Sequence, residues 1–577
     1  MYIYKIKIEN FRNFEHFEWK PNRRVNVLFG HNGCGKTNLA EAISLVFSTN
    51  RFENYFDKSD FFNGNDQKKI QIQIWFDDIN DIEIHLSEVL QHIDDKDNFI
   101  VDDQTTNSKA VVIYQLESGQ EGKMEWSFFN NIQPCASKFS DRDAISYIHI
   151  GADRQPLKEV GMQTKSTFYK LAKDSIAHEL ERISNEIISL ADNKINESSI
   201  LNDYLKELQI ISNVDIIENY SLMMKNPAST WNSSGYELGT SVGNTKLSFS
   251  RQSQGIQNLF LLLLMKKRLE GSGIVFVEEL EQNLEPKMQR YIADEYKKLG
   301  IGQLFITSHS PEIISHFEYS DISILHKETA IALLSGLDDL TVKKEIFRVN
   351  KKEFISALMA EKILLVEGES EYESFPIYSY QDNSSLSQND VEMIKIGGKA
   401  KVDIYCKTFK HFGKKVYVLL DNDTDITATL NKVKDNADVV YLAMNSYEDL
   451  IFPYADKFLN KLSELLDFTV VKNKLVGIYN TISTDSKKTA VKNSMEADSI
   501  DPNLYMSYTD LASSKSVLEY VLHDSFATSY CARAVANFIC EEKIVPMAYL
   551  NLIQHLSGKS QELNLHAGYS NVYELNG

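Results

Sequence analysis

Acidic residues end two apolar segments in the second half of this chain. The stretch ILLVEGESE places Glu367 at the end of a strand-like run and Glu371 four residues later. The stretch KKVYVLLDNDTD ends in Asp421, Asp423 and Asp425. If both strands belong to one sheet, at least four carboxylates meet at one edge, where their repulsion would be severe without divalent cations between them. The spacing predicts a metal site, against the alternative that these are solvated acids at strand ends.

The chemistry of such a site is hydrolysis of a phosphodiester. Two metal ions bound by four acids can activate a water molecule and stabilise the leaving oxygen. The four acids are Glu367, Glu371, Asp421 and Asp423. Ligands that are all oxygen favour Mg²⁺ or Mn²⁺ over Zn²⁺. Asp425 is either a further ligand or an exposed turn residue, and Glu448 is a candidate fifth acidic ligand, with Asp449 as its alternative.

A second motif, in the first half of the chain, is suited to binding nucleotide phosphate. A strand-like segment from Val25 to Phe29 runs directly into GHNGCGKT, and a helical pattern follows. In this phosphate-loop motif the glycines let backbone N–H groups surround phosphate oxygens, Lys36 reaches the β and γ phosphates, and the Thr37 hydroxyl ligates Mg²⁺. The motif predicts bound ATP with Mg²⁺. The binding residues are Gly30, Asn32, Gly33, Gly35, Lys36 and Thr37.

Three later segments add to the predicted ATP site. Ser253 and Gly255 begin a strongly apolar helix, where they suit contact with the γ-phosphate of nucleotide held by a second copy of the domain. The apolar run IVFV ends in Glu278 and Glu279, an acid pair that can hold Mg²⁺ through water, with Glu278 as the metal ligand, and orient the attacking water. A further strand leads to His309, a candidate sensor of the γ-phosphate.

These residues need a framework of strands, and the hydrophobic pattern indicates where the strands lie. In the first part they are predicted at residues 2–8, 25–29, 69–76, 81–86, 111–116, 124–129, 147–150, 274–277 and 303–306. Residues 94–109 are polar and are predicted to form a surface loop. Residues 166–217 have helical periodicity, which favours a helical hairpin that contacts either a second copy or its own domain. Arg154 either faces phosphate or forms a structural ion pair.

The length and composition are those of a multidomain globular protein. A chain of 577 residues is too long for one core and should hold two or three domains. Its hydrophobic content of 43% and charged content of 25% are ordinary. The net charge of −20 argues against general coating of nucleic acid, but it is compatible with an enzyme that has one basic channel and metal ions at its site.

The sequence also favours a cytoplasmic location. Five cysteines lack metal-ligand spacing and are expected to be free thiols in a reducing compartment. Residues 1–10 alternate like a strand and do not read as a signal peptide. The longest apolar run, residues 259–265, is too short to span a bilayer, so no membrane partner is expected.

Taken in order, the motifs resemble those of a known family. KIENFRNF, GHNGCGKT, SQGIQ, IVFVEELE and ITSHSP are similar to the ABC-type ATPase head of chromosome-maintenance and recombination proteins. With LLVEGESE and VLLDNDTD added, the chain resembles the OLD (overcoming lysogenisation defect) family of nucleases, in which such a head is fused to a Toprim domain. The sequence departs from the family pattern after the acid pair, where Leu280 and Glu285 replace residues that are often Pro and His.

The resemblance implies an α/β fold with four parts. Residues 1–165 are the first part of the ATPase head, and 166–220 form a helical insert that is a possible dimerisation element. Residues 221–345 complete the head, and 346–577 form a Rossmann-like Toprim nuclease domain with a helical C-terminal extension.

The resemblance also implies an activity and partners. We expect an ATP-regulated, divalent-metal-dependent DNA endonuclease that acts in bacterial anti-phage defence and assembles as a dimer or tetramer. Some relatives work with a helicase, and others with a reverse transcriptase and its RNA–DNA product. Family members also carry a late basic residue that could stabilise the charge developing on the phosphate. Lys515, Arg533 and Lys559 are the candidates here, against the alternative that each is a surface charge.

Two other functions use the same motifs. An ATP-dependent DNA-binding clamp or repair scaffold would carry a non-catalytic Toprim domain. A topoisomerase or primase would use the same Toprim acids, and the ABC-type head argues against both. Separate replacement of Glu367 and Asp423 by Ala distinguishes a nuclease from a scaffold.

Overall fold

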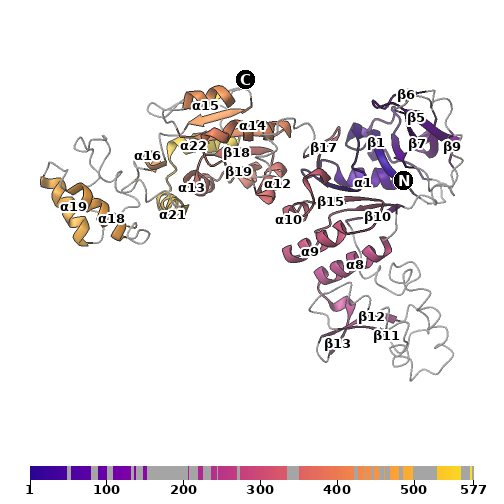
Figure 1. The fold of residues 1–577 in the computed structure, drawn as a ribbon, viewed down its shortest axis with the longest axis horizontal. Coiled ribbons are helices and arrows are strands. Elements are labelled where there is room, and N and C mark those ends of the chain that lie inside the picture. Colours follow the sequence, from indigo (N-terminus) through magenta and orange to yellow (C-terminus); the bar gives the residue numbers. More distant parts are fainter. Residues whose placement is uncertain are drawn as a thin grey trace. The chain divides into compact units, whose positions relative to one another are not determined.

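The computed structural model divides into two compact units, Met1–Gly336 and Leu337–Gly577 (Figure 1). Each unit has a hydrophobic core of its own. The sequence analysis places this junction at residues 345/346. The structure describes residues 1–48, 54–78, 89–100, 108–130, 135–137, 147–152, 206, 219–224, 236–242, 245–269, 273–333, 350–421, 426–433, 436–442, 447–451, 454, 461, 468–479, 485–497, 529–559 and 572–574.

An antiparallel sheet opens the first unit. Its strands follow the order β2-β1-β4-β7-β5-β6, and β8 and β9 continue from β7. Apolar residues of β1 and β4 that alternate with polar ones, such as Ile6, Ile8 and Ile72, are fully buried in the core. The strands are β1 Tyr2–Phe11, β2 Phe14–Trp19, β4 Gln71–Asp77, β5 Leu90–Ile93, β6 Phe99–Ile100, β7 Lys109–Ser118, β8 Met124–Phe129 and β9 Cys135–Ala136.

A second, mostly parallel sheet lies in the same unit. Its order is β10-β14-β15-β3-β16-β17, and only β17 is antiparallel to its neighbour. Runs such as IVFV are buried along their whole length, which is typical of parallel strands covered on both faces. The strands are β3 Val25–Phe29, β10 Tyr147–Ile150, β14 Ile274–Val277, β15 Gln303–Thr307, β16 Ile322–Leu325 and β17 Ala330–Ala332.

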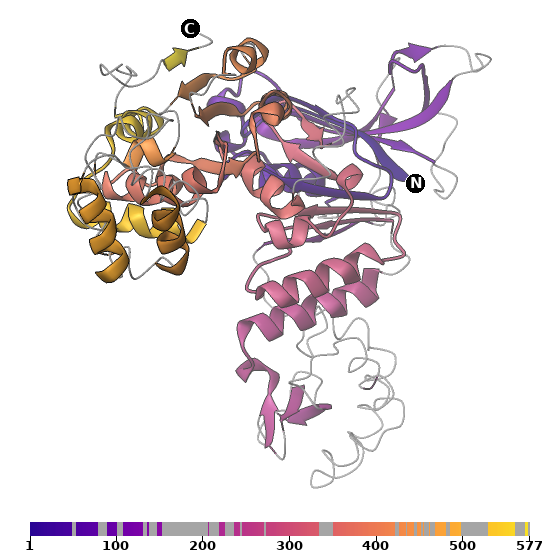
Figure 2. The ribbon, with the colours of Figure 1, turned by 60° about the vertical axis from the view of Figure 1, so that its left-hand side comes forward.

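Helices cover both faces of this parallel sheet. Helix α1 (Lys36–Val46) shares one core with the antiparallel and the parallel sheet, because Ile43 packs in the same cluster as Ile72 and Phe276. On the other face α8 (Gln254–Leu269) lies beside α9 (Pro286–Lys297), as Figure 2 shows. The remaining described elements of the unit are α10 Pro311–Ile314 and a separate antiparallel sheet of β11 Asn219–Met224, β12 Tyr236–Val242 and β13 Thr245–Ser248.

One residue of the segment that was predicted as a surface loop, Asp97, links strands of the N-terminal sheet. Asp97 has a side chain that is only 7% exposed, and its carboxylate accepts hydrogen bonds from Tyr4 at 2.8 Å and Lys5 at 2.7 Å and pairs with Lys20 at 2.8 Å. Burial alone would raise the pKa of Asp97, but the hydrogen bonds from Lys20, Lys5 and Tyr4 outweigh it and lower the pKa to about 2. Residues 94–98 form a turn with exposed residues, as predicted, but the burial of the Asp97 side chain and the short strand β6 were not predicted, because a polar sequence does not reveal cations on distant strands.

We predict that Asp97→Asn destabilises the head by about 2 kcal/mol, because the buried Lys5 ammonium would lose one of its two carboxylate partners and be left with the half-exposed Glu18. The folded pKa of Asp97 lies below the unfolded value of about 3.9, so its contribution is complete above about pH 4 and is lost as the pH falls towards 2. Thermal unfolding should show a deficit that is constant from about pH 5 to 8 and shrinks below about pH 4. The exposed neighbour Asp95→Asn is the matched control, and an equal deficit in both variants would contradict the assignment.

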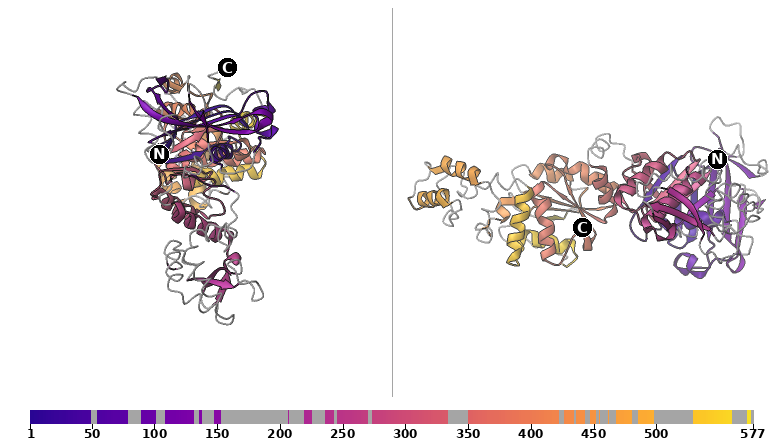
Figure 3. Two further views of the ribbon diagram at one scale, coloured as in Figure 1. Left: turned by 90° about the vertical axis from the view of Figure 1, so that its right-hand side faces the viewer. Right: turned by 90° about the horizontal axis from the view of Figure 1, so that it is seen from below.

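The second unit is a three-layer domain. Its described sheet has the order β19-β18-β20-β21-β22, with four parallel strands and an antiparallel β22 at the edge. Helices lie on both faces of this sheet (Figure 3). The strands are β18 Lys362–Val366, β19 Val391–Lys395, β20 Lys415–Leu420, β21 Val439–Leu442 and β22 Val572–Glu574. The helices are α12 Lys351–Met359, α13 Glu369–Gln381, α14 Val402–His411, α15 Ile426–Val433, α16 Tyr447–Ile451, α18 Phe468–Tyr479, α19 Asp485–Ala497, α21 Ser529–Glu541 and α22 Met547–Leu556.

Different helices pack against the two faces of this sheet. Alternate residues of β18, Leu364 and Val366, belong to a core cluster that also contains Phe375 of α13 and residues of α21 and α22. On α12 and α14, Phe354 stacks near Phe409 with ring centroids 5.7 Å apart. The C-terminal region therefore contributes part of the core on which the central strands rest.

Several predicted features lie outside the described residues. They are the strand at 81–86, Arg154 and almost all of the helical insert at 166–220. The four cysteines whose side chains are described are free thiols, as expected. Within the described ranges, no helix is both long and apolar enough to cross a bilayer.

Candidate functional site

The predicted phosphate loop lines a cavity of about 250 Å³ in the first unit. Register explains why distant residues meet there, since Thr307 of β15 pairs with Leu28 of β3 while Ile306 pairs with Val277 of β14. The carboxyl ends of three neighbouring parallel strands therefore lie at one edge of the sheet. The lining residues are Asn32, Gly33, Gly35, Lys36, Thr37, Asn38, Glu279, Thr307 and His309.

The lysine of the phosphate loop is folded onto its own loop. The Nζ of Lys36 donates to the carbonyl of Gly30 at 2.8 Å and to that of His31 at 3.1 Å. Gly35 has a φ of +110°, and a Cβ there would lie 2.4 Å from the Nδ2 of Asn13, so both conformation and packing require glycine. Burial lowers the pKa of Lys36, and Cys34, Glu279 and Glu281 act in the opposite direction. This charge lies where an anionic phosphate would sit.

The structure separates the two members of the acid pair. The side chain of Glu279 lines the cavity, and its backbone N–H donates to the hydroxyl of Thr307 at 3.1 Å. Glu278 is 3% exposed and is not among the residues that line the cavity. Its carboxylate lies 2.8 Å from the Nε2 of His149 on the neighbouring strand β10. Glu279 is therefore the acid of the pair that faces the predicted nucleotide.

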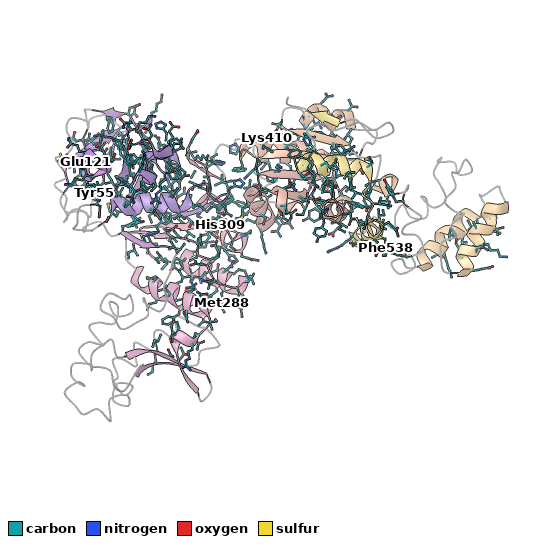
Figure 4. The ribbon with its side chains drawn as sticks, turned by 180° about the vertical axis from the view of Figure 1, so that it is seen from behind. Tyr55, Glu121, Met288, His309, Lys410 and Phe538 are labelled. Carbon is teal, nitrogen blue, oxygen red and sulfur yellow. The ribbon has the colours of Figure 1, made fainter. Side chains whose placement is uncertain are left out.

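His309 is held in place by an acid that the sequence analysis left without a role. Its backbone N–H donates to the Oε1 of Glu281 at 2.5 Å. His309, which is labelled in Figure 4, is among the residues that line the cavity. Burial and then the Lys36 ammonium lower the pKa of His309, whereas Glu281 and Glu279 oppose the shift. The Oε2 of Glu281 is buried and has no hydrogen-bond partner among the described residues. In the sequence, the position of Glu281 two residues after the acid pair was the signal that could have identified it as part of this site.

Ser253 and Gly255 lie at the start of α8 and are not among the residues that line this cavity. The hydroxyl of Ser253 accepts the backbone N–H of Ile256 at 3.3 Å, as an N-terminal capping residue does. A Cβ on Gly255 would lie 2.8 Å from the carbonyl oxygen of Asn283, so close helix packing requires this glycine. Their predicted contact with a second copy's nucleotide stays a prediction.

Three of the predicted Toprim acids, Glu367, Glu371 and Asp421, are described, and they follow strand ends at one edge of the second sheet. Val366 pairs with Leu419 in register, so Glu367 and Asp421 directly follow the ends of two adjacent parallel strands, β18 and β20. Glu371 lies in the first turn of α13, is 6% exposed, and accepts the backbone N–H of Gly368 at 3.0 Å. Glu367 therefore lies between the end of β18 and the start of α13, and Glu371 lies in the first turn of that helix.

Two residues beyond the predicted set interact electrostatically with these acids. Lys399 follows β19, and its Nζ lies 3.6 Å from the Oε2 of Glu367. Tyr549 of α22 is fully buried, and burial and then the charges of Glu371 and Asp421, among nearby groups, raise its pKa well above the ordinary value. Both carboxylates therefore lie within electrostatic range of one hydroxyl. Lys399 was visible in the sequence as part of Gly397-Gly398-Lys399, whereas no sequence signal marked Tyr549.

Family models match both units. The model described as AAA ATPase domain matches residues 1–238 and 126–314, together more than half of the chain. The model described as Overcoming lysogenization defect protein-like, TOPRIM domain matches residues 358–423. The chain is similar to Endonuclease GajA from Bacillus cereus (strain VD045), at 24% identity over 454 residues, which are 72% of this chain and 74% of that protein.

The chain belongs to the OLD family of ATPase–Toprim nucleases.

Other similarities of this OLD-family protein are local or distant. DNA replication and repair protein RecF from Citrifermentans bemidjiense is 42% identical over 53 residues, which cover 9% of this chain and 15% of that protein. The solved Smc head bound to the C-terminal winged-helix domain of ScpA matches with a TM-score of 0.38 and 15% identity, covering 57% of this chain and 96% of that one. The SMC head domain from Thermotoga maritima matches with a TM-score of 0.30 and 14% identity, covering 57% of this chain and 99% of that one.

The described residues of the OLD-type site fit a divalent cation. The donors are carboxylate oxygens, which hard cations prefer, and the Oε2 of Glu367 is buried without a hydrogen-bond partner among the described residues. Within the described part of the chain, no three His, Cys, Asp or Glu side chains are grouped as ligands. Asp423 and Asp425 lie outside the described residues, and only the backbone of Glu448, in α16, is described.

The late basic candidates of this OLD-family chain have other partners where they are described. Arg533 lies 3.9 Å from Glu373, and Lys559 lies 3.0 Å from Asp382. Lys515 lies outside the described residues. Of the basic side chains in the described part of the chain, the one with a measured ion pair to Glu367 is Lys399.

We predict that Glu279→Gln lowers ATP hydrolysis by about 100-fold and leaves ATP binding intact, since the amide cannot accept a proton from the attacking water. Phosphate release and equilibrium binding of a fluorescent ATP analogue measure the two effects. Glu318→Gln, on an exposed acid of the same unit, is the control. Normal hydrolysis by Glu279→Gln together with inactive Glu278→Gln would transfer the role to Glu278.

Proposed function

We propose that this protein is an ATP-regulated, divalent-metal-dependent DNA endonuclease. The observation that carries the proposal is the position of Glu367 and Asp421 directly after the ends of adjacent parallel strands in register, with a buried Glu371 in the first turn of the helix that follows Glu367. Carboxylates that follow adjacent strand ends repel one another unless cations are present, and the protein supplies one cation, Lys399, 3.6 Å from Glu367. The name of the similar GajA protein, an endonuclease, supports phosphodiester hydrolysis as the reaction.

The roles of the residues follow from their positions. Glu367, Glu371 and Asp421 would hold the metal ions, together with Asp423, and Asp425 and Glu448 are further candidate ligands. Divalent ions, when bound, lower the pKa of a water and offset charge on the phosphate. In the reaction the water oxygen bonds to phosphorus, the bond from phosphorus to one sugar oxygen breaks, and that sugar oxygen takes up a proton.

The protein orients its carboxylates through fixed hydrogen bonds and packing. The N–H of Gly368 donates to one oxygen of Glu371 and so limits its rotation. Tyr549 packs edge-on against Phe375 at 5.1 Å and Tyr378 at 5.7 Å, which fixes the orientation of its ring. Such support keeps ligands in place before ions bind, as metal sites require.

The ATPase head would control the nuclease rather than act as a motor. Its residues are suited to nucleotide: Lys36 and Thr37 for the phosphates and Mg²⁺, Glu279 for the attacking water, and His309 for the γ-phosphate. Ser253 and Gly255 would contact nucleotide of a second copy, which makes ATP a link between copies in a dimer or tetramer.

DNA is the proposed substrate, and bacterial anti-phage defence the proposed role. The net charge of −20 requires that DNA be bound at a localised site with metal ions rather than over the whole surface. A helicase, or a reverse transcriptase with its RNA–DNA product, is the proposed kind of partner, by resemblance to the family alone.

Replacement of the strand-end acids tests the reaction. Glu367→Gln and Asp421→Asn should each lower plasmid cleavage in Mg²⁺ or Mn²⁺ by about 100-fold or more, because each removes a charged ligand. Glu369→Gln, an ion-paired exposed acid two residues from Glu367, should cleave normally. A scaffold with a non-catalytic Toprim domain would instead keep its function in all three variants.

The regulatory claim has its own test. Cleavage should differ by about tenfold between samples without nucleotide and samples with a non-hydrolysable ATP analogue. Lys36→Met should abolish this difference, because it removes the phosphate-binding ammonium. Equal cleavage rates with and without nucleotide would refute control by the head while leaving the nuclease assignment intact.

A further inference from the structure

A short loop after β19 places a lysine at the edge of the nuclease site. Strands β18 and β19 are parallel, and the N–H of Ile396 donates to the carbonyl of Val366 at 3.0 Å. Glu367 is the residue that follows Val366, so the loop that begins at Gly397 starts beside this acid. The order of strands thus brings Lys399 to Glu367 across 32 residues of sequence.

The loop is open where it faces away from the core. Gly397 and Gly398 have φ values of +66° and +117°, which favour glycine. A Cβ built on either residue would meet no atom within 4 Å, so internal packing does not account for the absence of side chains. Two successive glycines at an open sheet edge leave room for a ligand's backbone to approach closely.

The ion pair at this edge is close without being a tight hydrogen bond. The Nζ of Lys399 lies 3.6 Å from the Oε2 of Glu367, and the two side chains are 12% and 24% exposed. A nearby lysine, Lys395, differs because its ammonium donates a hydrogen bond directly to the carboxylate of Glu369. The side chains of Lys395 and Glu369 are 40% and 43% exposed. Lys399 therefore holds its charge against a predicted metal ligand, whereas Lys395 forms an ordinary surface pair.

We propose that Lys399 is a catalytic residue of the nuclease that exchanges partners. Without metal it neutralises Glu367, and when divalent ions occupy the carboxylates it binds a non-bridging oxygen of the scissile phosphate. The inference rests on the proposed function and identifies the cation of that site. An ammonium next to the phosphate would offset the charge that develops during hydrolysis.

The exchange has a direct consequence for metal affinity. In the metal-free protein the positive charge of Lys399 competes with a cation for Glu367, so its removal should favour metal binding. A lysine that only ties the loop to β18 would have the reverse effect, because its loss would loosen the ligand. Removal of the Lys399 ammonium thus raises metal affinity and lowers cleavage only if Lys399 exchanges partners.

The test uses the full-length protein with Lys399→Met, Lys399→Arg and, as the matched control on the same loop, Lys401→Met. Mn²⁺ titration followed by electron paramagnetic resonance should show about fivefold tighter binding in Lys399→Met and wild-type binding in Lys399→Arg and Lys401→Met. Cleavage by Lys399→Met should fall about 100-fold, mainly in kcat, while Lys399→Arg retains part of it and Lys401→Met all of it.

Unchanged or weaker Mn²⁺ binding by Lys399→Met, in a protein with a wild-type melting temperature, would overturn the proposal. So would normal cleavage by that variant. If the wild-type protein cleaves no DNA, the proposed function fails, and the Mn²⁺ titration still decides whether Lys399 competes with metal for Glu367. Calorimetric melting of all variants shows whether any loss comes from misfolding.

Discussion

Parallel strands in register bring their carboxyl ends to one edge of a sheet, and both candidate sites of this protein depend on that constraint. In the head the edge gathers the phosphate loop, Glu279, Thr307 and His309. In the second unit it gathers Glu367 and Asp421. Neither group could be assembled by residues close in sequence, because the strands that carry them are separated by helices that cover the sheet faces.

The same constraint concentrates charge, and each site contains a lysine that offsets it. In the head, Lys36 is bonded to carbonyl oxygens of its own loop and lies near Glu279 and Glu281. In the nuclease unit, Lys399 lies against Glu367. Both lysines are largely buried cations at sites suited to phosphate, so an anionic ligand would meet a charge that the fold has already positioned.

Support for the nuclease site extends well past the matched Toprim segment. The family match ends at residue 423, yet Tyr549 packs against Phe375 of α13, and residues of α21 and α22 belong to the same core cluster as Leu364 and Val366 of β18. The C-terminal helices are therefore part of the site's structure. In the head a comparable distant contact is that of Asp97 with Lys5 and Lys20, which joins two hairpins of the N-terminal sheet.

The sequence by itself determined the motifs and the strands that carry them. The predicted strands 25–29, 124–129, 147–150 and 274–277 have the bounds of β3, β8, β10 and β14, because apolar runs between turn residues are local signals. The phosphate loop and the strand-end acids were likewise readable, since their chemistry requires fixed residue types at fixed spacing. The family followed from their order along the chain.

Only the tertiary structure decided which groups touch. It placed Glu279 at the cavity and turned Glu278 towards His149, a choice that two adjacent glutamates do not encode. It brought Glu281 to His309, Lys399 to Glu367, and Tyr549 within electrostatic range of Glu371. Each of these contacts joins residues on different strands or helices, and their distances depend on strand order and register rather than on any local pattern of sequence.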